Sequence, residues 1–397
     1  GKTLVAVMAM LECVESGGQA AFMAPSEILA RQHFETLSTM LMDFQLNIKI
    51  LTGRDRGAQR EELLSELKAG EIDILIGTHA LFQLDVIYHK LRLCIIDEQH
   101  RFGVQQRMEL GAKGKAVDIL IMSATPIPRS LSLAQYGDMD LSIIDEKPIG
   151  RKPIKTVLGS SNRINEIVGR IQKAIQDNKQ VYWVCPLVSE SEVLNLTSAE
   201  DRFLFLKEHL GEDLVGIIHG QQKSTEKDTT MERFLSGDIK VLVATTVIEV
   251  GVDVPNASIM VIEHAERFGL AQLHQLRGRV GRGSIESSCL LLFDNSISKA
   301  AKDRLSVLRE TEDGFLIAEK DLKTRGGGDL IGLEQSGLPK FKIADLATHA
   351  DLMLIAHQDA RFLLNEDPTL TGKRGKAAKT LLYLMEKENS IPLISIG

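Results

Sequence analysis

The chain has 397 residues, of which 44% are hydrophobic and 25% are charged, and its formal net charge at pH 7 is −7. This length exceeds what one ordinary core supports, so two domains of roughly 150 residues and a remainder are expected. No apolar run approaches the roughly 20 residues that cross a bilayer, and no signal-peptide pattern opens the chain, which predicts a soluble, cytosolic protein without membrane contact. The negative charge excludes a wholly basic, nucleic-acid-coating surface but leaves room for a local basic groove.

In the first half of the chain, apolar strand-like runs alternate with amphipathic helical runs. The runs expected as strands are residues 20–24, 48–51, 73–77, 93–97 and 119–123. Between the first two runs, apolar residues recur at the spacing of one helical face, namely Ala30, Phe34, Leu37 and Leu41. Alternation of this kind predicts a parallel sheet with crossover helices.

Prolines, a glycine and mixed charges interrupt the pattern at residues 146–153 and predict a linker. Beyond the linker, strands are expected at residues 180–188, 215–219, 240–244, 258–262 and 288–293, which predicts a second parallel α/β domain. Helical runs then follow at residues 299–312, 315–323, 343–364 and 375–388. We therefore predict an α/β protein with sheet domains at 1–148 and 153–295, followed by helical regions at 296–345 and 346–397.

The chain's four cysteines are Cys13, Cys94, Cys185 and Cys289. They are scattered without C-x-x-C spacing, and the last three lie inside expected strands. This pattern predicts small core residues that form neither disulfides nor metal sites.

The most informative stretch runs from Leu93 to His100, where four apolar residues end in two carboxylates, an amide and an imidazole. Ligands of open α/β sheets bind outside the carboxyl ends of the strands, so Asp97 and Glu98 are expected where a ligand would lie. One carboxylate can hold Mg²⁺ on a nucleotide phosphate while its neighbour polarises the attacking water. The alternative is a strand that runs into an acidic turn.

The tripeptide Gly1-Lys2-Thr3 has the composition of the end of a phosphate-binding loop that runs into its helix. In the full pattern the backbone cradles phosphates, Lys reaches the β and γ phosphates, and the hydroxyl binds Mg²⁺. A lone tripeptide of this kind is usually chance. Its place ahead of the apolar run that ends in Asp97 and Glu98, within a βαβ pattern, favours the functional interpretation.

Two segments of the second half also carry polar groups that suggest function. Near the end of an expected strand, Asp253 is a candidate for a ribose hydroxyl and Thr245 for a nucleic-acid phosphate. Farther on, helical spacing between Arg279 and Arg282 would put both guanidinium groups on one side, where they suit γ-phosphate oxygens. The alternatives for the arginines are a solvated basic turn or a contact with a nucleic-acid backbone.

Taken in order, these motifs resemble those of a superfamily 2 helicase motor: GKT, DEQH and SAT in the first half, then ATTVIEVGVDVP and QLRGRVGR in the second. Residues 97–107 and 123–129 are similar to the bacterial RecG family of branch-migration helicases, and residues 321–329 and 335–339 are similar to that family's translocation motif. The related transcription-repair coupling translocases tend to carry a second Glu where this chain has Gln99, so the resemblance favours RecG.

The resemblance implies two RecA-like domains in tandem, a helical-hairpin translocation motif at 296–345 and a helical C-terminal segment. It also implies a role for each matching residue. Gly1 and Lys2 would bind phosphates, Thr3 and Asp97 the Mg²⁺, Glu98 the attacking water and Asp253 the ribose. Gln99 and His100 would couple the nucleotide to the second domain, Arg279 and Arg282 would reach the γ-phosphate beside Gln275, and Thr245, Arg325 and Gln335 would couple hydrolysis to DNA.

The function implied by the resemblance is that of an ATP-dependent, Mg²⁺-requiring translocase that acts on branched double-stranded DNA in repair and recombination, through fork regression and Holliday-junction migration. A monomeric, nucleoid-associated cytoplasmic protein with single-stranded DNA-binding protein as a partner is expected. The alternatives are a transcription-repair coupling translocase, an RNA helicase or an inert DNA-binding fragment. The resemblance also implies a motor fragment without the family's N-terminal wedge domain. Because only the end of the phosphate loop is present, the fragment itself is expected to bind ATP weakly or not at all.

Overall fold

The computed structural model describes residues 1–97, 113, 117–124, 140–144, 146, 152–186, 192–245, 254–281, 285–325 and 349–385. The chain divides into two compact units, formed by residues 1–125 with 144–317 and by residues 126–143 with 318–397. The first unit contains both sheets. The domain boundaries expected from the sequence remain predictions.

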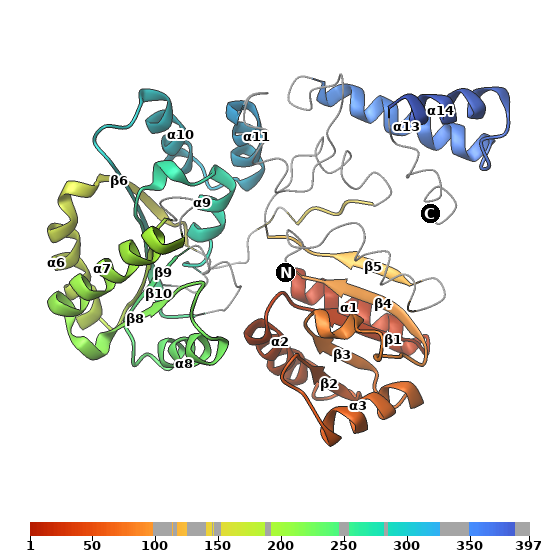
Figure 1. Cartoon of the computed structure of the whole chain (residues 1–397), viewed down its shortest axis with the longest axis horizontal. Coiled ribbons are helices and arrows are strands. Elements are labelled where there is room, and N and C mark those ends of the chain that lie inside the picture. The colour runs from red at the N-terminus through yellow and green to blue at the C-terminus, as the bar shows by residue number, and fades with distance from the viewer. Residues whose placement is uncertain are drawn as a thin grey trace. The chain divides into compact units, whose positions relative to one another are not determined.

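The first sheet has five parallel strands in the order β2-β3-β1-β4-β5 (Figure 1). Its strands are β1 (Gln19–Met23), β2 (Ile48–Leu51), β3 (Ile74–Gly77), β4 (Leu91–Ile96) and β5 (Asp118–Ile121). All of β1 and β3 is buried, as expected of strands that are covered on both faces. The parallel α/β architecture predicted for this half is confirmed.

Helices cover both faces of the first sheet. On one face, α1 (Lys2–Glu15) and α2 (Glu27–Met40) share a core with Phe22 and Ile95. On the other, α3 (Ala58–Ala69) and the 3-10 helix η1 (His79–Phe82) pack on Met23 and Ile96, because successive strand side chains point to opposite faces. The helical face predicted from residues 30–41 is confirmed as the buried side of α2.

The second sheet has six parallel strands in the order β6-β11-β10-β7-β9-β8. They are β6 (Lys155–Ser160), β7 (Gln180–Val184), β8 (Val215–Ile218), β9 (Val241–Ala244), β10 (Ala257–Ile262) and β11 (Ser288–Phe293). Helices α6 (Ile164–Gln176) and α7 (Glu192–Leu210) pack on one face, while α8 (Ser224–Leu235), α9 (Leu270–Arg277) and α10 (Lys299–Glu310) pack on the other. The short 3-10 helices are η3 (Ser161–Arg163), η4 (Glu212–Leu214) and η6 (Ala265–Arg267).

Strand β6 was not predicted from the sequence. It pairs in parallel with β11 at the edge of the sheet, and its residues are exposed or only half-buried. An edge strand of this kind carries no long apolar run, and here it directly follows the proline-containing linker. The strand expected at residues 180–188 is shorter than predicted. β7 ends at Val184, two residues before Pro186, which has no N–H for a strand ladder.

A buried glutamine begins a central strand of each sheet. Gln19 donates from Nε2 to the carbonyls of Leu67 and Ile72 at 3.1 and 2.8 Å. Gln180 donates in the same way to the carbonyls of Phe234 and Ile239. Both side chains thereby satisfy carbonyls of the helix-to-strand loops, and they fix those loops at the amino edge of each sheet.

The remaining helices are α11 (Gly314–Arg325), which follows α10, and α13 (Ala350–Glu366) and α14 (Lys373–Leu384) in the second unit. Asp367 links the last two helices by accepting hydrogen bonds from the backbone N–H groups of Thr371 and Gly372 at 3.0 and 2.8 Å. These bonds hold the pKa of the Asp367 carboxyl below its usual range. In the part of the chain that the structure describes, no helix combines the length and hydropathy needed to cross a membrane.

All four cysteines are buried and unpaired by disulfides, as predicted. Burial raises the pKa of Cys94 and of Cys289 to about 12, so at pH 8 only about one thiol in ten thousand at either position is a reactive thiolate. We expect the native protein to resist iodoacetamide at pH 8 and the urea-unfolded protein to react at all four positions, as counted by mass spectrometry. Fast native labelling of Cys94 or Cys289 would contradict the buried placement.

Candidate nucleotide-binding and hydrolysis site

Helix α1 brings the residues predicted to bind phosphate to the carboxyl edge of the first sheet. It turns into β1 through Gly17, which has a left-handed φ of 74°, and it contacts β1 and β4. Because this tight turn reverses the chain, α1 runs antiparallel to the strands and starts at their carboxyl edge. Its 14 residues span about 21 Å, enough to cross the sheet from edge to edge.

The first turn of α1 is suited to an anion. The Gly1 carbonyl accepts from Val5 N at 3.2 Å, and the turn contains no acidic residue. Lys2 and Thr3 occupy the first two helical positions, where free backbone N–H groups and the helix dipole favour a phosphate. The assignment of Gly1, Lys2 and Thr3 to the nucleotide remains a prediction.

Asp97 directly follows β4 at this same edge. Its backbone N–H donates to the carbonyl of Met23 in β1 at 2.9 Å, which continues the pairing of the two strands. Its carboxylate Oδ2 lies 3.1 Å from Nε2 of His33 in α2, and both side chains are nearly buried. The carboxylate therefore has a fixed place at the edge of the sheet where α1 begins.

The donor set fits Mg²⁺. A carboxylate and a hydroxyl, from Asp97 and Thr3, are hard oxygen ligands, and Mg²⁺ is usually held by one or two such groups together with substrate phosphates. Within the described ranges there is no cluster of three His, Cys, Asp or Glu residues that would favour a different, protein-enclosed metal.

Several predicted site residues lie outside the described residues. These are Glu98, Gln99, His100, Asp253, Arg282 and Gln335. Arg325 is the last residue of α11, and the structure describes its backbone position alone. The roles predicted for these residues are not tested by the geometry.

Two predicted residues of the second domain are described at or near the carboxyl edge of its sheet. Thr245 follows β9, is buried, and donates from its backbone N to Ile218 O at 3.3 Å. Gln275 is half-buried in α9. Their predicted contacts with nucleic acid and nucleotide stay predictions.

The helical conformation expected at Arg279 is not present, and Arg282 lies outside the described residues. Helix α9 ends at Arg277, and Arg279 lies in the turn beyond it with only 6% of its surface exposed. Gly281 has a left-handed φ of 74°, and a Cβ there would approach Cγ1 of Ile154 to 2.8 Å, so a side chain would be strained as well as crowded. The glycines of this segment therefore stop the helix and form a loop.

Arg277, the first arginine of this segment, has a role that the sequence did not indicate. It is buried, and its Nη1 donates to the carbonyls of Leu308 and Thr311 at 2.7 and 3.0 Å, at the end of α10. Burial lowers the pKa of its guanidinium, and the bonded carbonyls satisfy its donors. The start of the arginine loop, residues 278–281, is thus tied to the end of α10.

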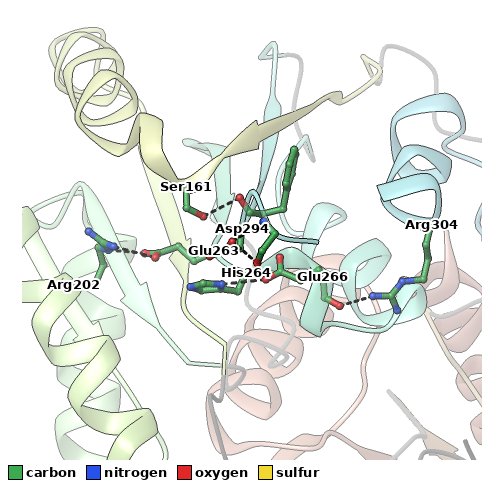
Figure 2. Close-up of polar contacts among 9 residues, drawn as sticks. Ser161, Arg202, Glu263, His264, Glu266, Asp294 and Arg304 are labelled. Carbon is green, nitrogen blue, oxygen red and sulfur yellow. Dashed lines mark hydrogen bonds and ion pairs between the residues drawn. The ribbon is translucent and has the colours of Figure 1, made fainter. Parts of the chain in front are cut away.

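A buried ionic cluster was also missed, at the carboxyl ends of β7 and β10 (Figure 2). Glu263 follows β10 and accepts from Nε of Arg202 at 2.6 Å, from Nη2 of Arg202 at 3.1 Å and from Nε1 of Trp183 at 2.5 Å. Next in the chain, His264 lies 3.1 Å from Glu266, whose backbone carbonyl accepts from Arg304. The available sequence signal was a lone acid directly after a buried apolar strand.

Comparisons with known families define the class of protein. The family model for DEAD/DEAH box helicases matches residues 1–133, and the model for the helicase conserved C-terminal domain matches residues 163–284. The model for "ATP-dependent DNA helicase RecG, domain 3, C-terminal" matches residues 311–389. The two parallel-sheet domains and these matches define the class as proteins with tandem helicase domains of the DEAD/DEAH-box type.

Comparisons with individual proteins narrow this class to one family. The chain is 47% identical over 378 residues to an ATP-dependent DNA helicase RecG of Pasteurella multocida, with 94% of this chain and 54% of the relative covered. It is 49% identical to the RecG of Escherichia coli K12 over 87% of this chain and 51% of that one. A structure described as RecG bound to a three-way DNA junction matches with a TM-score of 0.73 and 45% identity, over 89% of this chain and 46% of that chain.

The chain belongs to the RecG family. It spans about half the length of the relatives it matches.

Proposed function

We propose that this chain is the motor of an ATP-dependent DNA helicase that acts on branched double-stranded DNA. The observation that carries the proposal is the placement of Asp97 and the start of α1 at one edge of the first sheet. The family membership supports the same conclusion, because the relatives are named ATP-dependent DNA helicases. The alternatives, a transcription-repair coupling translocase, an RNA helicase and an inert scaffold, are not favoured by these relatives.

In the proposed reaction, Lys2 neutralises the β and γ phosphates of ATP. Thr3 and Asp97 hold Mg²⁺, which supplies charge stabilisation to the transferred phosphoryl group. Glu98 orients the attacking water and accepts its proton as the bond to the γ-phosphorus forms and the bond to the leaving ADP oxygen breaks. Hydrolysis yields ADP and inorganic phosphate.

Residues of the second domain would respond to the state of the nucleotide. Arg279 and Arg282 stabilise charge on the γ-phosphate, with Gln275 beside them, and Asp253 binds the ribose. Gln99 and His100 link the first domain to the second. Closing of the two domains around ATP and reopening after hydrolysis would then change the contacts with DNA.

Coupling to DNA would pass through Thr245, Arg325 and Gln335. The bonds from Arg277 to the end of α10 support this route, since they join the arginine loop to the helices that precede Arg325. We extend the proposal, on the family resemblance alone, to a monomer in the bacterial cytoplasm that associates with the nucleoid and with single-stranded DNA-binding protein. The predicted boundaries at 148, 153, 295 and 345 belong to the same proposal.

The substrate class is tested by stimulation of ATP hydrolysis. We expect a three-way DNA junction to raise the rate of phosphate release more than linear duplex DNA, and RNA of equal length to have little effect. The reason is that one family relative has a structure described as bound to a three-way DNA junction. Equal or greater stimulation by RNA would favour the RNA helicase, and no hydrolysis with any nucleic acid would favour the scaffold.

A further inference from the structure

His33 occupies a position where an apolar residue would be expected. It lies on the buried face of α2, one helical turn from Leu29 on one side and from Leu37 on the other. Its ring packs on Phe22 of β1, with the ring centroids 4.7 Å apart. A polar side chain at a core position costs stability unless it is hydrogen-bonded. His33 therefore needs a hydrogen-bonding partner inside the domain.

That partner is the carboxylate of Asp97, at 3.1 Å from Nε2 of His33. An ionised carboxylate can only accept hydrogen bonds, so Nε2 carries the proton and donates it. Both side chains are about nine-tenths buried, which makes their hydrogen bond stronger and more orienting than a surface contact.

Both anchors of Asp97 come from one continuous segment. Its backbone is held by Met23 at the end of β1, and its side chain is held by His33 in α2, the helix that follows β1. Ser26 caps the start of α2 by accepting from Leu29 N at 3.3 Å, which fixes the entry of the helix only a few residues after Met23. The orientation of the Asp97 carboxylate therefore depends on how α2 is seated.

We propose that His33 is a positioning residue for the proposed metal ligand Asp97, so that it sets the affinity of the site for the divalent cation. The inference rests on the proposed function, in which Asp97 holds Mg²⁺. Side chains that hydrogen-bond a metal ligand hold it in the orientation that the metal needs, and their loss typically weakens metal affinity by about ten- to a hundredfold. His33 itself contacts neither nucleotide nor metal in this proposal.

The test measures binding of Mn²⁺, as a paramagnetic substitute for Mg²⁺, to the whole chain in the presence of ADP by electron paramagnetic resonance. We expect His33→Leu to weaken Mn²⁺ binding by about ten- to a hundredfold and His33→Gln, which keeps an N–H donor, to remain within about threefold of the wild type. ADP affinity in EDTA should be unchanged, because the phosphate contacts do not involve His33.

The matched control is His209→Leu. His209 is also a helical histidine that packs on a phenylalanine, with its ring centroid 4.2 Å from that of Phe205, but it belongs to the second domain and bonds a backbone carbonyl. We expect this variant to bind Mn²⁺ as the wild type does.

Asp97→Asn separates failure of the inference from failure of the proposed function. If Asp97→Asn weakens Mn²⁺ binding and His33→Leu does not, the role of His33 is overturned alone. If neither variant changes Mn²⁺ binding, the metal role of Asp97 is overturned and the inference falls with it. An equal loss of metal-free ADP affinity in His33→Leu would show that His33 supports the fold, and this too would overturn the positioning role.

Discussion

Exchange of Glu98 for Gln is expected to slow ATP hydrolysis by about a hundredfold to ten-thousandfold, because the amide cannot accept a proton from the attacking water. Nucleotide and metal should still bind, since Gln keeps the size and the polarity of the side chain. Exchange of the neighbouring Asp97 for Asn should also lower turnover, by about two to three orders of magnitude, but through loss of the metal.

The two variants together distinguish base from ligand. Single-turnover phosphate release and Mn²⁺ binding in the presence of ADP are measured on both. We expect Glu98→Gln to retain Mn²⁺ affinity and Asp97→Asn to lose it, while neither supports hydrolysis at the wild-type rate. An unchanged hydrolysis rate in Glu98→Gln would contradict the assignment of Glu98 as the base. Equal Mn²⁺ affinity in both variants would contradict the assignment of Asp97, and not Glu98, as the metal ligand.

Removal of the Arg202 side chain should lower the stability of the second domain. Arg202→Leu leaves Glu263 as a buried carboxylate with the Trp183 N–H as a remaining donor. Breaking a buried ion pair from one side costs about 3 to 5 kcal/mol, and the lower end applies here because 22% of the Arg202 side chain is exposed. The double variant Arg202→Leu with Glu263→Leu should recover part of this loss, since it leaves no unpaired charge.

Trp183 makes this measurement local. It is the chain's single tryptophan and is fully buried in β7, so urea unfolding followed by its fluorescence reports on the second domain. The control is Arg170→Leu, which breaks an ion pair with Glu166 at 2.7 Å whose arginine is 75% exposed, and which should leave the unfolding midpoint unchanged. If Arg202→Leu unfolded at the same urea concentration as this control, the ionic cluster would not contribute to the stability of the second domain.

The central strands were predictable because burial on both faces leaves a direct trace in the sequence. β1, β3 and β4 are mostly apolar, and so is β7 in the second sheet. β6 left no such trace, since an edge strand can be half-exposed and polar. The expected helix does not reach Arg279, and the left-handed Gly281 two residues beyond it has a conformation that the spacing of charges does not encode.

Only those candidate site residues that belong to a local sequence motif could be predicted. Asp97 was predicted because it is an acid that follows an apolar strand, whereas His33, its hydrogen-bonding partner, lies 64 residues earlier. Glu263 and Arg202 are separated by 61 residues. Periodicity and motif order carry no information on such long-range pairs, which are created when the helices pack on their sheets.

Ile154 lies directly after the linker between the two sheet domains, where it contacts two other segments of the chain. Its backbone N–H donates to Glu312 in the connection between α10 and α11 at 2.5 Å, and its side chain lies against the Gly281 backbone in the arginine loop. Three segments thus meet at Ile154: the end of the linker, the arginine loop proposed to contact the γ-phosphate, and the connection between α10 and α11. A displacement of Ile154 would therefore affect all three segments at once, although they lie far apart in the sequence.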